Sequence, residues 1–357
     1  MALFKDILHS DESLLKNELA LDYSFLPKIL PHREQQQRYI AAIIKPLLNE
    51  RNGKNLFVYG APGIGKTAAM RFVLNELAEE TEEIYTIYIN CWQKNTTFKI
   101  IVDICEQLGY KFTHNKRTEE LFEIIKNMAN KKAVVFAFDE VDKLEEVDFL
   151  YSILEDIYKK SIILVTNDKE WLNDLDDRVK SRLLAETLEF KPYSLFETKD
   201  VLRQRMEYAF FPGVLDDDAF ELIANKTAEV QDIRTGLHLM REAANIAESK
   251  SARKITLEHA QEALSKLDEF TIKKSTDLTE EEQKILDIIK KNSEKKIGDL
   301  YLLYKELGGE LVYKSFQRKI DKLERNRFIS VAKTTGGKDG NTSIVKYANT
   351  AKKLTEF

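Results

Sequence analysis

An eight-residue segment, Gly60–Thr67, restricts the folds open to this chain more than any other part of the sequence. It reads Gly-Ala-Pro-Gly-Ile-Gly-Lys-Thr and lies between the strand-like run Leu56–Tyr59 and the helical stretch Ala68–Glu79. This is the spacing of a phosphate-binding loop, in which glycines let backbone N–H groups close around phosphate oxygens at the N-terminus of a helix. The segment therefore predicts nucleotide binding. Its candidate residues are Gly60, Ala61, Pro62, Gly63, Ile64, Gly65, Lys66, Thr67 and Ala68.

Catalytic roles follow from the same loop and from a later pair of acids. We expect Lys66 to reach the β- and γ-phosphates of ATP, and the Thr67 hydroxyl to bind Mg²⁺. The apolar run Ala133–Phe138 leads directly into Asp139 and Glu140. A buried strand that ends in two carboxylates downstream of a phosphate loop indicates that Asp139 holds Mg²⁺ and that Glu140 polarises the attacking water.

A third polar strand end supplies another candidate. The run Ile162–Val165 ends at Thr166 and Asn167. The C-terminal tips of parallel strands line the ligand cleft, so Asn167 is placed to orient water as an uncharged donor and acceptor. Taken alone, Asn167 fits a turn-forming residue as well.

The order of the predicted elements indicates an α/β fold with three domains. Strand-like runs alternate with helical stretches as far as about residue 190, which is typical of a parallel sheet covered by helices. The pattern is then purely helical, and Ile272–Asp277 reads as a polar linker. With 13 Gly and 6 Pro in 357 residues, a turn-rich all-β fold is excluded. We expect a nucleotide-binding domain over residues 1–190, a helical lid over 191–272 and a smaller domain over 273–357.

Composition narrows the class of protein further. Residues 278–357 carry 17 basic and 12 acidic residues, a net +5, whereas the preceding part carries 38 and 48, a net −10. A basic C-terminal end on an acidic body suggests a polyanionic partner, although a solvated Lys-rich tail is an equal alternative. Two cysteines exclude a disulfide framework, and no apolar run reaches the ~18 residues that span a bilayer. We expect a soluble, cytoplasmic protein.

The C-terminal part contains a helix with a basic face. Over Tyr313–Arg325, a 100° helical period places four basic residues, Lys314, Arg318, Lys322 and Arg325, within an ~80° arc and the apolar residues opposite. Strand-like runs around a Gly-rich turn follow, which is the order of a winged helix. Such a helix enters the major groove of DNA while the wing follows the backbone or minor groove. A protein-binding winged helix is the alternative. The candidate DNA contacts are Lys314, Arg318, Lys322, Arg325 and the wing residue Lys338, with Arg318 as the base-reading residue.

Several segments together resemble the AAA+ ATPases of the archaeal origin-recognition and cell-division-control type of replication initiator. The segments are Leu30–Glu34 ahead of the phosphate loop, Asp139–Asp142, Leu175–Leu183, Phe190–Tyr193 and Asp232–Leu237. They occur in the family's order over essentially the whole chain. The resemblance implies an AAA+ (RecA-like) nucleotide-binding subdomain, an AAA+ lid and a C-terminal winged-helix domain.

The resemblance also implies roles for individual residues. Asn167 corresponds to sensor 1 and Arg234 to sensor 2, which reaches the γ-phosphate from the lid. Arg182, with Arg178 as second choice, corresponds to the arginine finger that enters a neighbouring subunit's site. Asp177 stands where the family usually has proline, and its charge beside Arg178 leads us to expect slow hydrolysis. Further implied nucleotide contacts are Pro31, His32, Arg33, Tyr193 and Arg234.

These features predict a replication initiator that uses ATP/ADP and Mg²⁺. By resemblance, its partners are double-stranded origin DNA, the replicative minichromosome-maintenance helicase and paralogous initiator subunits, so it is expected at the nucleoid. The family's projection before the Asp139 strand suggests a second DNA contact at Lys116 and Arg117, although a plain polar loop fits equally. The alternatives are a DNA-binding transcriptional regulator and a mobile-element or signalling helper ATPase.

Overall fold

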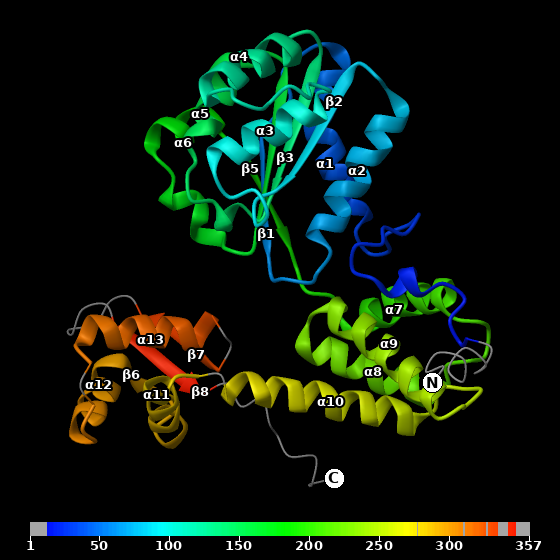
Figure 1. Ribbon diagram of the computed structural model, residues 1–357, viewed down its shortest axis with the longest axis vertical. Helices are drawn as coiled ribbons and strands as arrows, with labels where there is room; N and C mark the ends of the chain where they lie inside the picture. The colour runs from blue at the N-terminus through cyan, green and yellow to red at the C-terminus, as the bar shows by residue number, and fades with distance from the viewer. Residues whose placement is uncertain (1–12, 277, 310, 326–327, 335–341, 348–357) are drawn as a thin grey trace. The chain divides into compact units, whose positions relative to one another are not determined.

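The computed structural model describes residues 13–276, 278–309, 311–325, 328–334 and 342–347 (Figure 1). It divides into two compact units, Met1–Ser265 and Lys266–Phe357. Within the described residues, no helix is long and apolar enough to cross a membrane. The two units are described separately below.

The first unit is built on a five-stranded parallel sheet with the strand order β2-β3-β4-β1-β5. The four strands that the apolar runs predict are all present, and the α/β fold class is confirmed. A fifth, β5, was not predicted, because it lies at the edge of the sheet and its sequence Glu-Thr-Leu-Glu-Phe is not an apolar run. The strands are β1 (Leu56–Gly60), β2 (Ile84–Asn90), β3 (Ala133–Asp139), β4 (Lys160–Thr166) and β5 (Glu186–Phe190).

Helices cover both faces of this sheet (Figure 1). One face packs against α1 (Glu34–Ile44) and α2 (Lys66–Glu80). The other face packs against four helices, and β3 is buried along its whole length between the two layers. This explains its uninterrupted apolar sequence, since a central parallel strand has no solvent-facing side. The four helices are α3 (Thr97–Gln107), α4 (Thr118–Ala129), α5 (Asp148–Asp156) and α6 (Asp177–Leu183).

A helical lid follows β5 in the same unit. Its helices are α7 (Leu195–Ala209), α8 (Asp217–Val230), α9 (Ile233–Ser249) and the beginning of α10 (Leu257–Thr276). Ser194 and Glu197 form a capping box that fixes the start of α7. The N-terminal segment lies against the lid, where Lys16 and Asn17 donate backbone hydrogen bonds to the Ala209 carbonyl. The first residues that the structure describes thus lie against the lid.

The second unit has the order of a winged helix. Helices α11 (Glu280–Lys291), α12 (Ile297–Glu306) and α13 (Tyr313–Arg325) pack on a small antiparallel sheet of order β6-β8-β7. Its strands are β6 (Lys295–Lys296), β7 (Ile329–Thr334) and β8 (Thr342–Tyr347). The apolar side of α13 is fully buried, as its helical period predicts; the residues are Phe316, Ile320 and Leu323.

The linker prediction for Ile272–Asp277 was wrong. Helix α10 continues through Thr276. The stretch Leu257–Thr276 contains neither Gly nor Pro and is rich in Ala, Leu, Glu and Lys, so nothing in it stops the helix. The polarity that suggested a linker is that of a helix with a polar sequence.

Candidate nucleotide site and nucleic-acid interface

The C-terminal ends of β1, β3 and β4 open into a cleft of about 480 Å³ in the first unit. Residues of α7 and α9 of the lid form its opposite wall. This volume lies within the usual range of ligand pockets, about 300–1,000 Å³. The cleft is lined by Tyr23, Ser24, Leu30, Pro62, Gly63, Gly65, Lys66, Thr67, Ala68, Arg71, Tyr88, Asn90, Gln93, Asp139, Glu140, Thr166, Asn167, Tyr193, Val201, Arg205, Ile233, Arg234 and Leu237.

Lys66 is the first residue of α2 and its side chain is buried at the base of this cleft. Its Nζ donates to the carbonyls of Gly60 (2.8 Å) and Ala61 (2.7 Å) and to Asn167 Oδ1 (2.8 Å). Burial lowers the pKa of Lys66 to about 8. The phosphate loop and the tip of β4 therefore share one ammonium group, which is placed to donate hydrogen bonds to phosphate oxygens.

Asp139 lies at the end of β3 with its carboxylate almost fully buried. Asp139 Oδ2 accepts hydrogen bonds from Thr67 Oγ1 (2.7 Å) and from the Tyr88 hydroxyl (3.0 Å). Its Oδ1 accepts the backbone N–H of Glu140 (3.0 Å). Burial raises the pKa of Asp139. A hydroxyl and a carboxylate in contact are the oxygen ligands that Mg²⁺ takes beside a bound nucleotide, so the chemistry of this pair fits the metal.

Glu140 follows Asp139 with φ at +57°, in the left-handed region. Its neighbour across the sheet edge is Asn90, which pairs in register with Asp139. Asn90 Oδ1 accepts the backbone N–H groups of Trp92 (2.9 Å) and Gln93 (3.2 Å), which leaves its amide N–H groups to donate. Burial raises the pKa of Glu140, while a hydrogen bond from Asn90 favours its ionised form. Asn90 thus holds the carboxylate that we predict to polarise water.

Three polar residues at this edge were missed by the sequence reasoning: Tyr88, Asn90 and Asp142. Asp142 Oδ1 accepts the hydroxyl of Thr166 (3.0 Å), one residue before Asn167. Tyr88 and Asn90 occupy alternate positions at the end of β2. The strand-tip argument that selected Asn167 would have selected them too, had it been applied to the strand predicted at Ile84–Ile89.

The segment ahead of the phosphate loop braces the loop and the lid. Arg33 is buried, donates to the carbonyls of Ile64 (2.9 and 3.1 Å) and Lys191 (2.8 Å), and stacks 3.8 Å from the ring centre of Tyr193. His32 Nε2 lies 3.0 Å from Asp200 of α7. Pro31, His32 and Arg33 do not line the cleft, whereas Tyr193 does. Among the described contacts, those of His32 and Arg33 hold the phosphate loop and the lid in position, and neither side chain lines the cleft.

The lid reaches the phosphate loop at the start of α9. Ile233 donates its backbone N–H to the Gly63 carbonyl (3.1 Å), and Asp232 caps α9 beside it. Arg234 lines the cleft with 49% of its side chain exposed. Both oxygens of Asp232 hold its guanidinium (3.1 and 3.0 Å). Arg234, the predicted sensor 2, therefore lies at the cleft but is paired with Asp232, the N-cap of its own helix.

The two candidate finger residues lie elsewhere, on α6. Arg178 is 77% exposed and pairs with Asp176 (3.0 Å). Arg182 pairs with Glu155 and lies 4.8 Å from the ring centre of Tyr151. Neither lines the cleft.

Comparison with known proteins identifies the family. The AAA domain profile matches residues 49–188, and the Cdc6 AAA+ ATPase-type lid domain profile matches residues 199–265. The ORC1-type DNA replication protein 1 of Sulfurisphaera tokodaii is 31% identical, over 95% of this chain and 91% of that protein. This chain belongs to the ORC1-type DNA replication protein family.

Other members agree with this assignment. The ORC1-type DNA replication protein of Thermococcus kodakarensis is 32% identical, over 97% of this chain and 90% of that protein. Among solved structures, the Aeropyrum pernix ORC1 protein in complex with DNA has a TM-score of 0.70 and 27% identity, with 95% of each chain covered. The Aeropyrum pernix ORC2 protein in ADPNP–ADP complexes, at 18% identity and a TM-score of 0.65, shares the fold. The expected resemblance and fold are confirmed.

The predicted DNA contacts of this ORC1-type chain fall into three groups. Lys314 and Arg318 are exposed on α13. Lys322, by contrast, is held by Glu282 of α11 (2.8 Å). The side chain of Arg325 and all of Lys338 lie outside the described residues.

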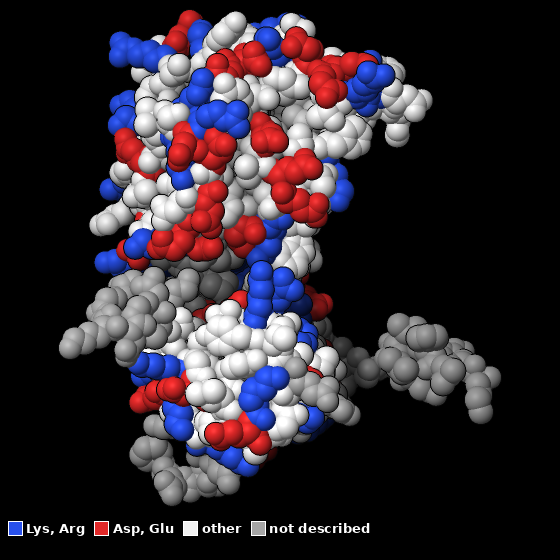
Figure 2. Space-filling view, turned by 90° about the vertical axis from the view of Figure 1, so that its left-hand side faces the viewer, with Lys and Arg blue, Asp and Glu red and all other residues white. Residues whose placement is uncertain are grey.

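The candidate second contact lies in the first unit. Lys116 is half-buried and Arg117 is exposed, in the loop between α3 and α4. On the face of this unit that Figure 2 shows, basic and acidic side chains are interspersed. The charge pattern of that face therefore does not mark a DNA-binding patch.

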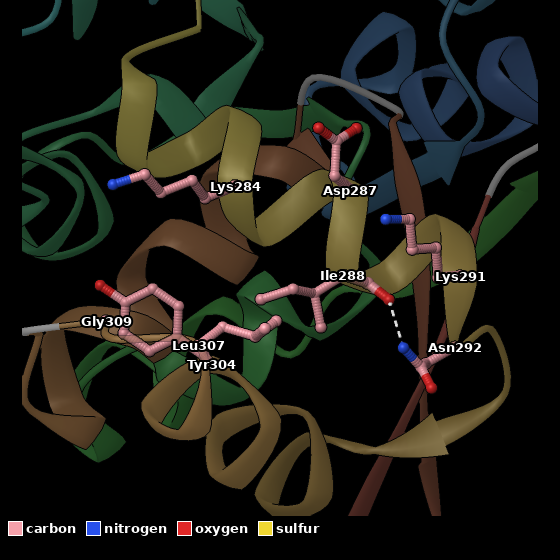
Figure 3. Close-up of a pocket in the computed structure, with 8 residues that line it drawn as sticks. All are labelled: Lys284, Asp287, Ile288, Lys291, Asn292, Tyr304, Leu307 and Gly309. Carbon is pink, nitrogen blue, oxygen red and sulfur yellow. Dashed lines mark hydrogen bonds between the residues drawn. The ribbon is translucent and has the colours of Figure 1, made fainter.

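A smaller hollow of about 280 Å³ lies between α11 and the end of α12 in the winged-helix unit (Figure 3). Ile288, Tyr304 and Leu307 form its apolar part, and Lys284 and Lys291 extend from the α11 side. The Tyr304 hydroxyl is already bonded to Glu281 (2.5 Å). None of its lining residues belongs to α13. This hollow is therefore separate from the predicted DNA-binding helix.

Proposed function

We propose that the cleft binds ATP with Mg²⁺ and hydrolyses it slowly. Lys66 would move from the loop carbonyls to the β- and γ-phosphates, and Thr67 and Asp139 would hold the metal, which neutralises phosphate charge when bound. The supporting observation is that the phosphate loop, two carboxylates and a polar strand tip all line one cleft.

In this proposal, the remaining polar residues control the attacking water. Glu140 would accept a hydrogen bond from the water, and Asn167 would orient it once Lys66 turns to phosphate. Asn90 competes for the Glu140 carboxylate. Arg234 must likewise leave Asp232 to reach the γ-phosphate. Each of these exchanges delays hydrolysis, which fits a nucleotide that serves as a switch.

A finger residue from a neighbouring copy or paralogue completes the proposed site. Arg182 is the first choice and Arg178 the second. Arg178 is tied to Asp176 and adjoins Asp177, and the negative charge of these two carboxylates opposes the approach of a phosphate. Arg182 must exchange Glu155 for the phosphate. A guanidinium suits the task because it stays charged and forks onto two oxygens.

We further propose that the chain initiates replication by binding origin duplex through α13. Membership of the ORC1-type family carries this proposal, and the solved Aeropyrum pernix ORC1 protein in complex with DNA supports it. Arg318 would read base edges in the major groove, and Lys314 would contact phosphate. The ATP state would then control recruitment of the minichromosome-maintenance helicase and of paralogous subunits.

The DNA-binding assignment is tested by Arg318→Ala in the full-length chain. We expect weaker binding to duplex from the chain's own replicon and reduced preference over random duplex, by about 1–3 kcal/mol for a base-reading arginine. Lys284→Ala is the control, because Lys284 is an exposed lysine of the same unit on α11. Unchanged affinity and preference in Arg318→Ala, measured by fluorescence anisotropy, would remove α13 as the reading helix.

A further inference from the structure

Glu282 is the buried carboxylate of the winged-helix unit, with 0% of its side chain exposed. Its Oε1 accepts hydrogen bonds from Lys319 Nζ (2.7 Å) and Lys322 Nζ (2.8 Å). Its Oε2 accepts the backbone N–H of Thr279 (3.0 Å), the N-cap of α11. One acid thus ties the first turn of α11 to two cations of α13. A buried carboxylate requires such partners, because an unpaired charge in the interior is very unfavourable.

Glu282 is ionised at neutral pH. Burial by itself raises the pKa of Glu282, but Lys319, Lys322 and the Thr279 N–H outweigh it and bring the pKa down to about 2. At neutral pH the two ammonium groups therefore face a charged carboxylate.

The positions of Lys319 and Lys322 on α13 determine how their contact with Glu282 affects DNA binding. At 100° per residue, Lys319 lies between the outward face of Lys314 and Arg318 and the buried apolar side, and Lys322 lies at the edge of the outward face that is nearer to Lys319. Their side chains are 29% and 52% exposed, so both retain access to solvent. Glu282 draws them toward α11 and away from the outward face.

We propose that Glu282 is a positioning residue for DNA recognition, which holds Lys319 and Lys322 away from phosphate so that Arg318 and Lys314 determine how α13 meets the duplex. This rests on the proposed DNA binding. Phosphate attraction is independent of sequence, so every lysine withheld from it lowers binding to all duplexes alike and leaves base contacts to decide between them. The Glu282 carboxylate thus lowers the affinity for every duplex and raises the preference for the recognised sequence.

The direct test is Glu282→Gln in the full-length chain, with binding to random duplex measured across a salt series. Release of Lys322, the more exposed lysine, should tighten this binding and steepen the log–log salt dependence by about 0.9 for one added phosphate contact. Between 50 and 200 mM salt, the variant should therefore lose about 3.5-fold more affinity than the wild-type chain loses. The preference for origin duplex over random duplex should fall. A purely structural role would weaken binding and leave the salt slope unchanged, and that result would overturn the proposal.

A double variant separates the released lysine from other effects. Glu282→Gln combined with Lys322→Met should return the salt slope to the wild-type value, because the freed cation is removed. A steep slope that persists in the double variant would contradict the role given to Lys322.

The single lysine variants test the proposal even if Glu282→Gln does not fold, which thermal unfolding would reveal. Lys322→Met should leave the salt slope unchanged, whereas Lys314→Met, its exposed neighbour on α13, should reduce the slope by about 0.9. An equal reduction in both would show that Lys322 already contacts phosphate, and the proposal would fail. If the wild-type chain binds no duplex at all, the proposed DNA binding itself fails and the role of Glu282 falls with it.

Discussion

At the scale of single residues, the cleft is organised by side chains that orient other side chains. Asp139 receives three donors, from Thr67, Tyr88 and the Glu140 backbone. Its carboxylate is therefore aimed before any metal arrives, which lowers the cost of ordering it on binding. The Tyr88 hydroxyl helps to hold the Asp139 carboxylate in this orientation and takes no direct part in the proposed ATP hydrolysis.

Tyr88→Phe should weaken Mg²⁺-dependent ATP turnover about fivefold, the equivalent of one neutral hydrogen bond of ~1 kcal/mol. Titration of Mg²⁺ at fixed ATP measures it, and the loss should appear mainly in the metal concentration required. Tyr85→Phe is the control, because Tyr85 lies on the same strand and its ring packs near Lys132, away from Asp139. Equal effects of the two substitutions would contradict the role of the Tyr88 hydroxyl.

Lys66 predicts a pH dependence of ATP binding. Burial lowers its pKa from 10.5 to about 8 in the nucleotide-free cleft, so the amine loses its proton as the pH rises through 8. Phosphates favour the ammonium form, so binding at pH 9 should take up a proton, and affinity should fall by up to about tenfold per pH unit above 8. Calorimetry in buffers of different ionisation enthalpy measures this uptake. At pH 7 the group is already charged and contributes none. Buffer-independent heats at pH 9 would refute the prediction.

The residues that the sequence could predict are those with a local pattern. Lys66, Thr67 and Asp139 are predicted because motif spacing and strand order place them together. The contacts of Glu282 with Lys319 and Lys322 could not be predicted, because the partners are about 40 positions apart and an ordinary capping-box glutamate looks the same in sequence. The pairing depends on how α11 packs against α13.

At the scale of elements, the phosphate loop and the start of α9 form one joint. Ile233 bonds to the Gly63 carbonyl, and a Cβ on Gly63 would overlap the Asp232 carboxylate. Gly63 also has φ at +73°, where other residues are strained. The lid position and the loop conformation are therefore linked through this glycine.

Gly63→Ala should disturb this joint and weaken ATP binding at least about tenfold, because the methyl group must displace Asp232 and, with it, Arg234. Gly213→Ala is a matched control: its φ is +76°, but a Cβ there meets no atom within 4 Å. Both substitutions carry a similar backbone cost of about 1 kcal/mol. Thermal unfolding should report that shared cost, and only Gly63→Ala should change ATP affinity. Equal ATP affinities in the two variants would show that the close approach of Gly63 to Asp232 does not affect ATP binding.

The same scale shows what element prediction misses. The four central strands are apolar because they are buried, so their sequence identifies them. Strand β5 exposes alternate residues at the sheet edge, and its two glutamates make its sequence unlike the apolar runs of the central strands. The polar end of α10 was mistaken for a linker, because polarity alone does not distinguish an exposed helix from a loop.

At the scale of the whole molecule, the chain combines an acidic nucleotide-binding body with a basic winged-helix unit. Residues 278–357 carry a net +5 within a chain of net −5. The described part of the winged-helix unit engages two of its lysines with Glu282, so not all of that charge is available to DNA. The net charge of residues 278–357 thus suggests a polyanionic partner, whereas the arrangement of the charged side chains determines which of them can contact that partner.

The central claim is that this ORC1-type chain binds defined duplex sites under the control of ATP. Nuclease footprinting on duplex from the chain's own replicon, with random duplex as control, a salt series, and ATP or ADP, tests it most directly. We predict discrete protected sites that survive competitor DNA and whose extent differs between ATP and ADP. Uniform, salt-sensitive protection that is indifferent to the nucleotide would contradict the claim and indicate a general DNA tether.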